Sequence, residues 1–273
     1  MTEPTQKSAE RIRTEWTLGT YPNLARAFMD IAAVLVDGVG VEPGERVLDV
    51  ACGTGNAAVT AHRRGGDVTG VDITPAMLER AREHASVLDA DVDWREADAA
   101  DLPFEDDAFD VTLSCLGHMF VTDPGAAGTE LVRVTRPGGR IGFTSWTLGS
   151  AIDEMVDTLV EYLPPRSDAP PSPHRWGDPD TVRERLGDSV EDLRFETHVS
   201  NYPALSPAHF WEGMAADSGA VLLALDHVDE SERAALDAAM AGTLDPFYSE
   251  ADNAMELEYQ LVTATVPQAP ASV

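Results

Sequence analysis

The residues best suited to chemistry in this chain are a glycine turn and an acidic residue downstream of it. Residues 47–55 read VLDVACGTG, an apolar run that ends in Gly53, Thr54 and Gly55, and Asp72 closes the next apolar run. Glycines at such a turn let backbone N–H groups approach a ligand that a Cβ would block. An acidic side chain about 20 positions later can accept hydrogen bonds from two ribose hydroxyls. The pattern predicts a site for a nucleoside cofactor.

Two nucleoside cofactors fit the turn itself. A dinucleotide site favours G-x-G-x-x-G, and residues 53–58 read GTGNAA, with an alanine in the third place that such sites tolerate. The segment downstream discriminates better. Asp98 and Ala99 follow the third predicted strand, and residues 102–104 then read LPF. These positions have no role in a dinucleotide site. They therefore favour a nucleoside cofactor that is not a dinucleotide.

The elements that position these residues alternate between strand and helix. Apolar patterns predict strands at 46–51, 68–71, 92–96, 109–115 and 140–146, and helices at 56–64, 75–87 and 124–134. Thr74-Pro75 and Asp123-Pro124 are N-cap residues followed by proline, a helix start. The alternation predicts a parallel sheet covered on both faces, which binds ligands at the carboxyl ends of its strands. The glycine turn, Asp72, Asp98 and Ser114-Cys115 all lie at such ends.

The flanks of this alternation are more helical. Residues 9–39 have helical periodicity, broken at Tyr21-Pro22 because the residue before proline avoids helical geometry. Beyond residue 149 the pattern predicts a helix at 152–163, a proline-rich loop at 164–179, a strand at 193–200, a helix from Ser206-Pro207, a helix at 230–244, a strand at 256–266 and a frayed tail.

Four segments together resemble the class I S-adenosylmethionine-dependent methyltransferases, in the branch that includes the ubiquinone/menaquinone C-methyltransferases. They are VLDVACGTG (47–55), VTGVDITPAML (68–78), EADAADLPFEDDAFDV (96–111) and ELVRVTRPGGR (130–140), in the family's order and spacing. The resemblance implies an α/β fold with a doubly wound, Rossmann-like, seven-stranded sheet. Its strand order would be 3-2-1-4-5-7-6 with the last strand antiparallel.

The resemblance also implies a division of the chain. Residues 1–42 would form an N-terminal helical cap, 43–148 the cofactor-binding core and 149–190 an insert or lid. Residues 191–266 would complete the sheet and add substrate-side helices, and 267–273 would form the tail.

The resemblance assigns the methionine and ribose parts of S-adenosylmethionine to the first two strand ends. Gly53, Thr54 and Gly55 would pass under the methionine part. Asp49 would fix that loop or reach the amino group through water. Asp72 would bind the ribose hydroxyls.

The other parts of the cofactor fall to later positions. Ile73 and Met77 would flank the adenine, Asp98 would accept from its amino group, and the Ala99 N–H would meet a ring nitrogen. The backbone of Ser114 and Cys115 would lie beside the sulfonium. The resemblance also places Tyr21 as a cap over the cofactor. His118 is the titratable group expected nearest the transferred methyl group, which makes it the candidate general base; the alternative is that it only packs or hydrogen-bonds locally.

The composition limits the kinds of partner that the chain can bind. The chain carries 48 acidic and 19 basic residues, a formal net charge of −29, and its only lysine is Lys7. Nucleic-acid binding needs clustered cations, so this charge disfavours it, and an acidic, lysine-poor surface resembles those of extreme halophiles. The two cysteines, Cys52 and Cys115, have no metal-ligand spacing, so no metal is expected. No apolar run reaches 18 residues, so we expect a cytoplasmic protein without a membrane span.

The methyl acceptor is less defined than the donor. The segment after strand four reads SCLGHMF (114–120) and lacks the (Asn/Asp)-Pro-Pro-aromatic element of nucleic-acid amino methylases. Aromatic and sulfur side chains of the later region suggest a small apolar or planar acceptor, or a hydrophobic core under a lid: Trp146, Trp176, Tyr202, Phe210, Trp211 and Met214. Two alternatives remain open, a nicotinamide-dependent oxidoreductase and a cofactor-binding protein without turnover.

Overall fold

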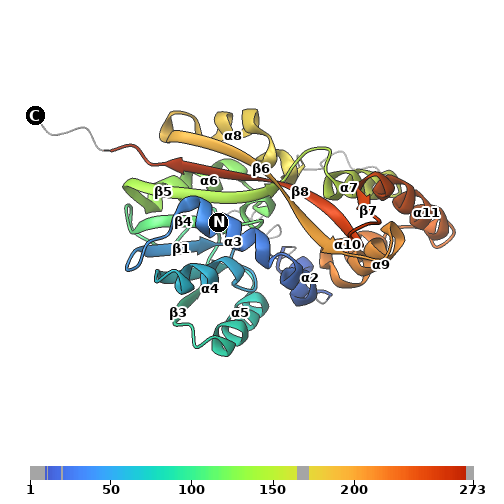
Figure 1. The fold of residues 1–273 in the computed structure, drawn as a ribbon, viewed down its shortest axis with the longest axis horizontal. Coiled ribbons are helices and arrows are strands. Elements are labelled where there is room, and N and C mark those ends of the chain that lie inside the picture. The colour runs from blue at the N-terminus through green and yellow to red at the C-terminus, as the bar shows by residue number, and fades with distance from the viewer. Residues whose placement is uncertain (1–9, 11, 20, 165–171, 269–273) are drawn as a thin grey trace, which may run out of the picture.

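A single twisted sheet organises the chain. The structure is a computed structural model that describes residues 10, 12–19, 21–164 and 172–268. Its eight strands include seven in the order β3-β2-β1-β4-β5-β8-β6, and the short β7 pairs with β8 (Figure 1). The strands are β1 (Arg46–Val50), β2 (Asp67–Asp72), β3 (Val92–Glu96), β4 (Phe109–Cys115), β5 (Thr135–Trp146), β6 (Glu191–Pro203), β7 (Tyr248–Ser249) and β8 (Ala254–Thr265).

The first five strands are parallel, and β8 runs antiparallel to both β5 and β6. The parallel strands are joined by helices, which is the connection that parallel pairing requires. The helices are α2 (Tyr21–Ala27), α3 (Met29–Val39), α4 (Asn56–Arg63), α5 (Pro75–Val87), α6 (Pro124–Val134), α7 (Ala151–Glu161), α8 (Pro179–Leu186), α9 (Pro207–Asp217), α10 (Gly219–Leu225) and α11 (Arg233–Leu244).

Side-chain caps explain where several helices begin. The side chains of Asp123, Ser150, Asp178 and Ser206 each accept a hydrogen bond from a backbone N–H in the first turn of α6, α7, α8 and α9. Such a bond satisfies one of the helix's unpaired donors. Thr74 also occupies the N-cap position of α5, but its hydroxyl makes no capping bond.

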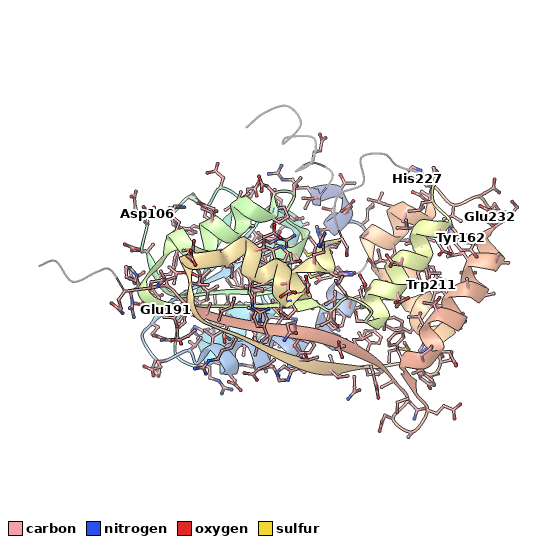
Figure 2. All side chains as sticks on the ribbon, turned by 90° about the horizontal axis from the view of Figure 1, so that it is seen from above. Asp106, Tyr162, Glu191, Trp211, His227 and Glu232 are labelled. Atoms are coloured by element: carbon pink, nitrogen blue, oxygen red, sulfur yellow. The ribbon has the colours of Figure 1, made fainter. Side chains whose placement is uncertain are left out.

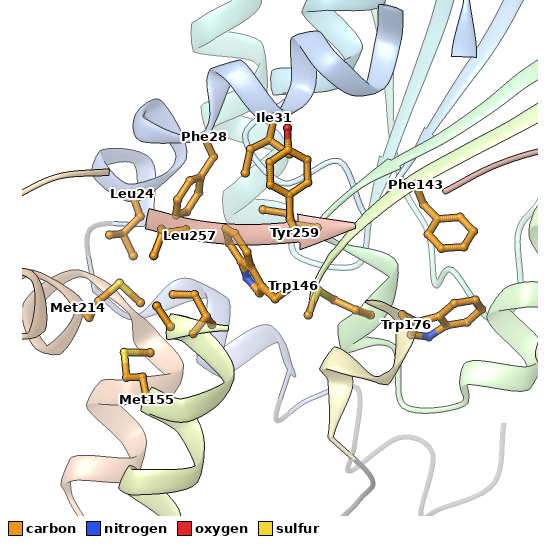
Figure 3. Close-up of a cluster of buried hydrophobic side chains, with 14 of the residues drawn as sticks. Leu24, Phe28, Ile31, Phe143, Trp146, Met155, Trp176, Met214, Leu257 and Tyr259 are labelled. Carbon is orange, nitrogen blue, oxygen red and sulfur yellow. The ribbon is translucent and has the colours of Figure 1, made fainter. Parts of the chain in front are cut away.

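Two apolar clusters cover the two faces of the sheet. On one face α3 and α4 pack against alternate strand residues such as Val47, Val111 and Leu113. On the other face Leu48, Ile141 and Phe143 belong to a larger cluster. The alternation follows from the two-residue period of a strand. The larger cluster continues into the helices at one end of the sheet, where Figure 3 shows Phe28, Trp146, Met155 and Met214 together.

The long strands β6 and β8 extend from the sheet into a helical lobe formed by α7, α9, α10 and α11 (Figure 1). Figure 2 shows Tyr162, Trp211, His227 and Glu232 on this lobe, with Asp106 and Glu191 at the opposite end of the molecule. Inside the lobe, the Trp211 indole N–H donates to Asp237 at 2.7 Å.

The predicted strand order is confirmed, with β8 in the place of the seventh strand. The predicted count of seven was one too low, because residues 248–249 form a two-residue strand beside β8. Strand β5 begins at Thr135 and not at residue 140, since Thr135 already pairs with Phe109 of β4 before a register shift. Helix α10 was not predicted, because GAVLLAL has no polar face.

Some predictions lie beyond what the structure tests. The proposed cap, core, insert and completion ranges stay predictions. The proline-rich loop at 164–179 and the tail from 267 lie partly outside the described residues. Among the helices that the structure describes, none has the length and apolar character needed to cross a membrane.

Candidate active site at the carboxyl ends of the strands

A cleft opens at the carboxyl ends of β1, β2 and β4. It encloses about 1110 Å³ of empty space, part of it open to solvent. The lining comes from the ends of these strands, the segment after β3 and the N-terminal helices. The lining includes nine of the predicted site residues: Tyr21, Gly53, Thr54, Asp72, Ile73, Met77, Asp98, Ala99 and Cys115. Asp49, Gly55, Ser114 and His118 are not among the lining residues.

The turn after β1 is held by two residues behind the cleft. Gly55 has a φ of 84°, and a Cβ there would lie 2.6 Å from Cη2 of Trp94, so only glycine fits without a shift. The buried Asp49 carboxylate accepts a hydrogen bond from the Ala58 N–H at 2.8 Å, at the start of α4. Burial raises the Asp49 pKa to about 7, against the opposing effect of the Ala58 hydrogen bond. Asp49 therefore fixes the glycine turn to α4.

Asp72 lies at the end of β2 and points its carboxylate into the turn. One oxygen accepts from the Gly53 N–H at 2.9 Å and the other from the Thr74 N–H at 2.8 Å. Burial raises the pKa of Asp72, while these hydrogen bonds lower it. Each carboxylate oxygen keeps a second lone pair. The side chain is therefore oriented by its own loop and still able to accept two ligand hydroxyls.

The next side chains along the cleft are mostly apolar. Ile73 lines it directly after Asp72, and Met77 is 5% exposed on the cleft-facing side of α5. Asp98 and Ala99 line it after β3, and the Asp98 carboxylate accepts from the Ala100 N–H at 3.0 Å. A flat apolar ring with a polar edge suits these surroundings.

The ends of β1 and β4 carry strained backbone beside the cleft. Ala51 and Leu116 both line it with positive φ values, 52° and 56°. Non-glycine residues in this region cost of order 1–3 kcal/mol each and cluster at functional sites. Gly117 allows the chain after β4 to pass close to Ala51, since a Cβ there would lie 2.3 Å from the Ala51 carbonyl oxygen.

Ser114 and Cys115 are the last two residues of β4, next to this close approach of the two chain segments. The buried Ser114 hydroxyl donates to the Val50 carbonyl at 2.7 Å and accepts from the His118 N–H at 3.0 Å. The Cys115 thiol lines the cleft, and burial raises its pKa to about 12, so it is a neutral wall group.

Aromatic side chains from the N-terminal segment and from the turn after β4 line the cleft together. The Trp16 ring meets Tyr21 at a centroid distance of 4.9 Å and Phe120 at 5.1 Å, both edge to face. Burial raises the pKa of Tyr21, and the nearby Cys115 and Asp72 add to this. The helical periodicity of residues 9–39 did not mark Trp16 as a cleft residue, and Phe120 was not predicted to line the cleft. Their apolar character was visible, but the face they point to was not.

His118 lies in the 3₁₀ turn His118–Phe120 but turns away from the cleft. Its ring has no exposed surface and packs between Phe143 and Trp176, at centroid distances of 4.4 and 4.6 Å. Figure 3 shows Phe143 and Trp176 side by side at one end of the buried cluster. Burial lowers the His118 pKa to about 3, with a smaller effect of Arg185. A general base must reach the acceptor. The structure gives His118 no such access, so we do not retain it as the base.

The aromatic side chains predicted for the substrate pocket also lie elsewhere. Trp146, Trp176, Phe210, Trp211 and Met214 are each at most 8% exposed and belong to the larger core cluster. Tyr202 packs at the edge of the same cluster. None of the six lines the cleft, so here the alternative of a hydrophobic core describes them better.

Comparisons with known proteins identify the family. The sequence model of the methyltransferase domain matches residues 48–143. An uncharacterized Mycobacterium tuberculosis protein is 36% identical over 270 residues, 95% of each chain. The demethylmenaquinone methyltransferase of Renibacterium salmoninarum is 33% identical over 169 residues, 57% of this chain and 70% of that one. The chain belongs to the class I S-adenosylmethionine-dependent methyltransferases.

Solved structures share the fold of this methyltransferase. A Bacillus halodurans protein assigned to the methyltransferases aligns with a TM-score of 0.59 at 17% identity, over 87% of this chain and 99% of that one. A Haemonchus contortus phosphoethanolamine N-methyltransferase in complex with S-adenosylhomocysteine aligns with a TM-score of 0.54 at 21% identity, over 88% of this chain and 53% of that one. The comparisons give no support to an oxidoreductase.

S-adenosylmethionine is the cofactor of this methyltransferase, and the cleft fits it. The open side of Gly53 leaves room that a side chain would fill, since the nearest atom lies 3.9 Å from the position that a Cβ would take. Asp72 offers two acceptor oxygens beside that space. An apolar slot at Ile73 and Met77 next to the Asp98 carboxylate suits an adenine.

Proposed function

We propose that this methyltransferase acts on a small, uncharged molecule with an apolar or planar ring. One observation carries the proposal: among the described residues that line the cleft, none has a cationic side chain. Arginine and lysine make the strongest protein contacts with a carboxylate or phosphate, so their absence from the described lining disfavours an anionic acceptor. The apolar part of the cleft beyond β4 comes from Leu116, Phe120 and Val121, together with Trp16, and the polar part from Thr122 and Asp123. Such walls favour apolar ligands.

The chain's own residues contribute alignment and exclusion of water. When bound, S-adenosylmethionine supplies an activated methyl group on a sulfonium. We propose that Asp72 and the glycine turn fix the ribose and methionine parts, and that Ile73, Met77, Asp98 and Ala99 hold the adenine. We propose that the Ser114–Cys115 backbone defines the edge along which the acceptor approaches. Holding two reactants in line lowers the barrier without a covalent intermediate.

A strong general base is not part of this proposal. Asp123 is the acidic side chain of the cleft wall beyond β4, and its carboxylate already caps α6 by accepting from the Ala126 N–H at 3.0 Å. The Cys115 thiol and the Tyr21 hydroxyl have raised pKa values and hold their protons. We therefore expect acceptors whose nucleophile needs little help in losing a proton.

Relatives and charge support an acceptor of this kind. Two relatives are named demethylmenaquinone methyltransferase, and a quinone is uncharged and planar. The net charge of −29 disfavours nucleic acid as an acceptor.

The test is a methyl-transfer screen at molar KCl, with S-adenosylhomocysteine release as the readout. Matched acceptors would differ only in charge: phenol against phenyl phosphate, and indole against indole-3-carboxylate. We expect turnover with uncharged members and at least tenfold less with their anionic partners. Preference for the anionic members would contradict the proposal. Cofactor binding without turnover of any acceptor would favour a silent binding protein.

A further inference from the structure

The described N-terminal segment 12–19 is held in place over the cleft. The Arg13 guanidinium donates to the Ile73 carbonyl at 2.9 Å and to Glu96 at 3.0 Å, which links the segment to the ends of β2 and β3. At its other end, a Cβ on Gly19 would lie 2.4 Å from the Asp217 carbonyl oxygen. A Cβ on Gly219 would lie 1.7 Å from the carbonyl oxygen of Glu15. The backbone of this segment therefore packs directly on α9 and α10.

This anchoring fixes the position of the Trp16 indole. Trp16 lines the cleft and contacts Tyr21, whose ring lies 3.9 Å from the Cβ position of Gly53 in the cofactor half. It also contacts Phe120, which belongs to the turn after β4 in the acceptor half. One rigid side chain thus spans the two halves at the mouth of the cleft.

The space left for an acceptor is bounded by this indole. An acceptor that approaches along Cys115 and Leu116 shares the cleft with the rings of Phe120 and Trp16, which contact each other. Aromatic walls favour flat rings through offset or edge-to-face contacts. A bulky indole held from both ends cannot move aside as an exposed side chain can, so it sets a limit on ring size.

We propose that Trp16 is a specificity-determining residue that limits the ring size of the acceptor, so that one-ring compounds are preferred over two-ring compounds. This inference rests on the proposed function, since it assigns a size limit to the same uncharged acceptor. Trp16 acts by contact with the acceptor and does not take part in the chemistry. Truncating it opens the mouth of the cleft to larger rings.

The experiment compares one-ring and two-ring acceptors with the same nucleophile: phenol with 1-naphthol, and hydroquinone with 1,4-dihydroxynaphthalene. The variants are Trp16→Ala, Trp16→Phe and, as a control, Leu18→Ala. Leu18 is a large apolar residue of the same segment that is 38% exposed and does not line the cleft. The measured quantity is the ratio of kcat/KM for the two-ring acceptor to that for the one-ring acceptor.

We expect Trp16→Ala to raise this ratio at least tenfold, Trp16→Phe to raise it by less, and Leu18→Ala to leave it unchanged. S-adenosylhomocysteine affinity, measured by calorimetry, verifies that each variant retains a formed cofactor site. An unchanged ratio in a Trp16→Ala protein that binds S-adenosylhomocysteine overturns the inference, as does an equal rise in Leu18→Ala. If Trp16→Ala does not fold, an unchanged ratio in Trp16→Phe overturns it. Wild-type protein that methylates neither uncharged ring overturns the proposed function instead.

Discussion

At the scale of single residues, burial decides which titratable groups take part in chemistry. His118 and Asp49 are both fully buried near the ends of the strands, and each is held neutral over part of the usual pH range. His118 has two ring nitrogens without a hydrogen-bond partner among the described residues, so its ring acts as a packing group between aromatic side chains. Asp49 does have a partner, and its task is to hold the glycine turn.

The raised pKa of Asp49 predicts a specific pH dependence of stability. The pKa of the carboxyl is 3.8 in the unfolded chain and about 7 in the folded protein. Folding therefore takes up a proton between these values, and the stabilising contribution, complete below 3.8, is lost as the pH rises towards about 7.

An Asp49→Asn variant has no group to ionise at position 49, so this fall in stability with rising pH is absent. The difference in unfolding free energy, variant minus wild type, is expected to grow by a few kcal/mol between pH 4 and pH 8. Urea unfolding at several pH values measures it. A difference that stays constant, or shrinks with rising pH, would show that Asp49 is ionised throughout.

At the scale of elements, the two glycines of the turn between β1 and α4 have different surroundings. Gly55 is enclosed, with Trp94 and Ala81 against the position of its missing Cβ. Gly53 faces the cleft and has open space around it. Both have positive φ values, 84° and 53°, so alanine strains the backbone at either position by roughly 1–2 kcal/mol.

Alanine at these two positions is expected to have different effects. Gly55→Ala adds a clash with Trp94 and should lower the unfolding free energy by about 1–3 kcal/mol more than Gly53→Ala. Gly53→Ala should instead weaken S-adenosylhomocysteine binding at least tenfold, because its Cβ projects into the cofactor cleft. Urea unfolding and calorimetry measure the pair. Equal losses of stability, or wild-type affinity in Gly53→Ala, would contradict this division.

At the scale of the whole molecule, charge repulsion dominates the surface. Several of the ion pairs between described residues are exposed, and such pairs contribute little and weaken in salt. Acidic residues outnumber basic ones 48 to 19, so the net long-range effect is repulsive. Salt screens that repulsion more than it weakens these pairs.

Stability should therefore rise with salt. Raising KCl from 0.2 to 2 M is expected to increase the Tm by roughly 5 °C, equivalent to about 3 kcal/mol in a chain of this length. Thermal unfolding monitored by circular dichroism measures this, with sucrose as a non-ionic control. A Tm that falls with KCl, or that rises only with sucrose, would contradict the role given to charge repulsion.

The sequence predicted the sheet well because its parallel strands are short apolar runs separated by clear helix starts. The convergence of Asp72 and Asp98 on one cleft was predictable for the same reason, since Asp72 ends β2 and Asp98 lies two residues after β3. Trp16 and Phe120 were not predictable as cleft residues, because helical spacing marks an apolar face without saying whether it meets core or cavity. The sequence could not show that His118 points away from the cleft, because the rotation of one 3₁₀ turn decides which side chain faces it. In the structure Phe120 faces the cleft.

Calorimetric titration of S-adenosylhomocysteine tests whether Asp72 holds the cofactor at the end of β2. Wild-type protein and Asp72→Asn would be titrated in molar KCl, with NAD as a second ligand. Losing a charge-assisted pair of hydrogen bonds should weaken S-adenosylhomocysteine binding about 10–100-fold, equivalent to about 1.5–3 kcal/mol. NAD should give no binding heat with either protein. Equal S-adenosylhomocysteine affinity in the two proteins would contradict this role of Asp72. Tight NAD binding by the wild type would contradict the assignment of S-adenosylmethionine to the cleft.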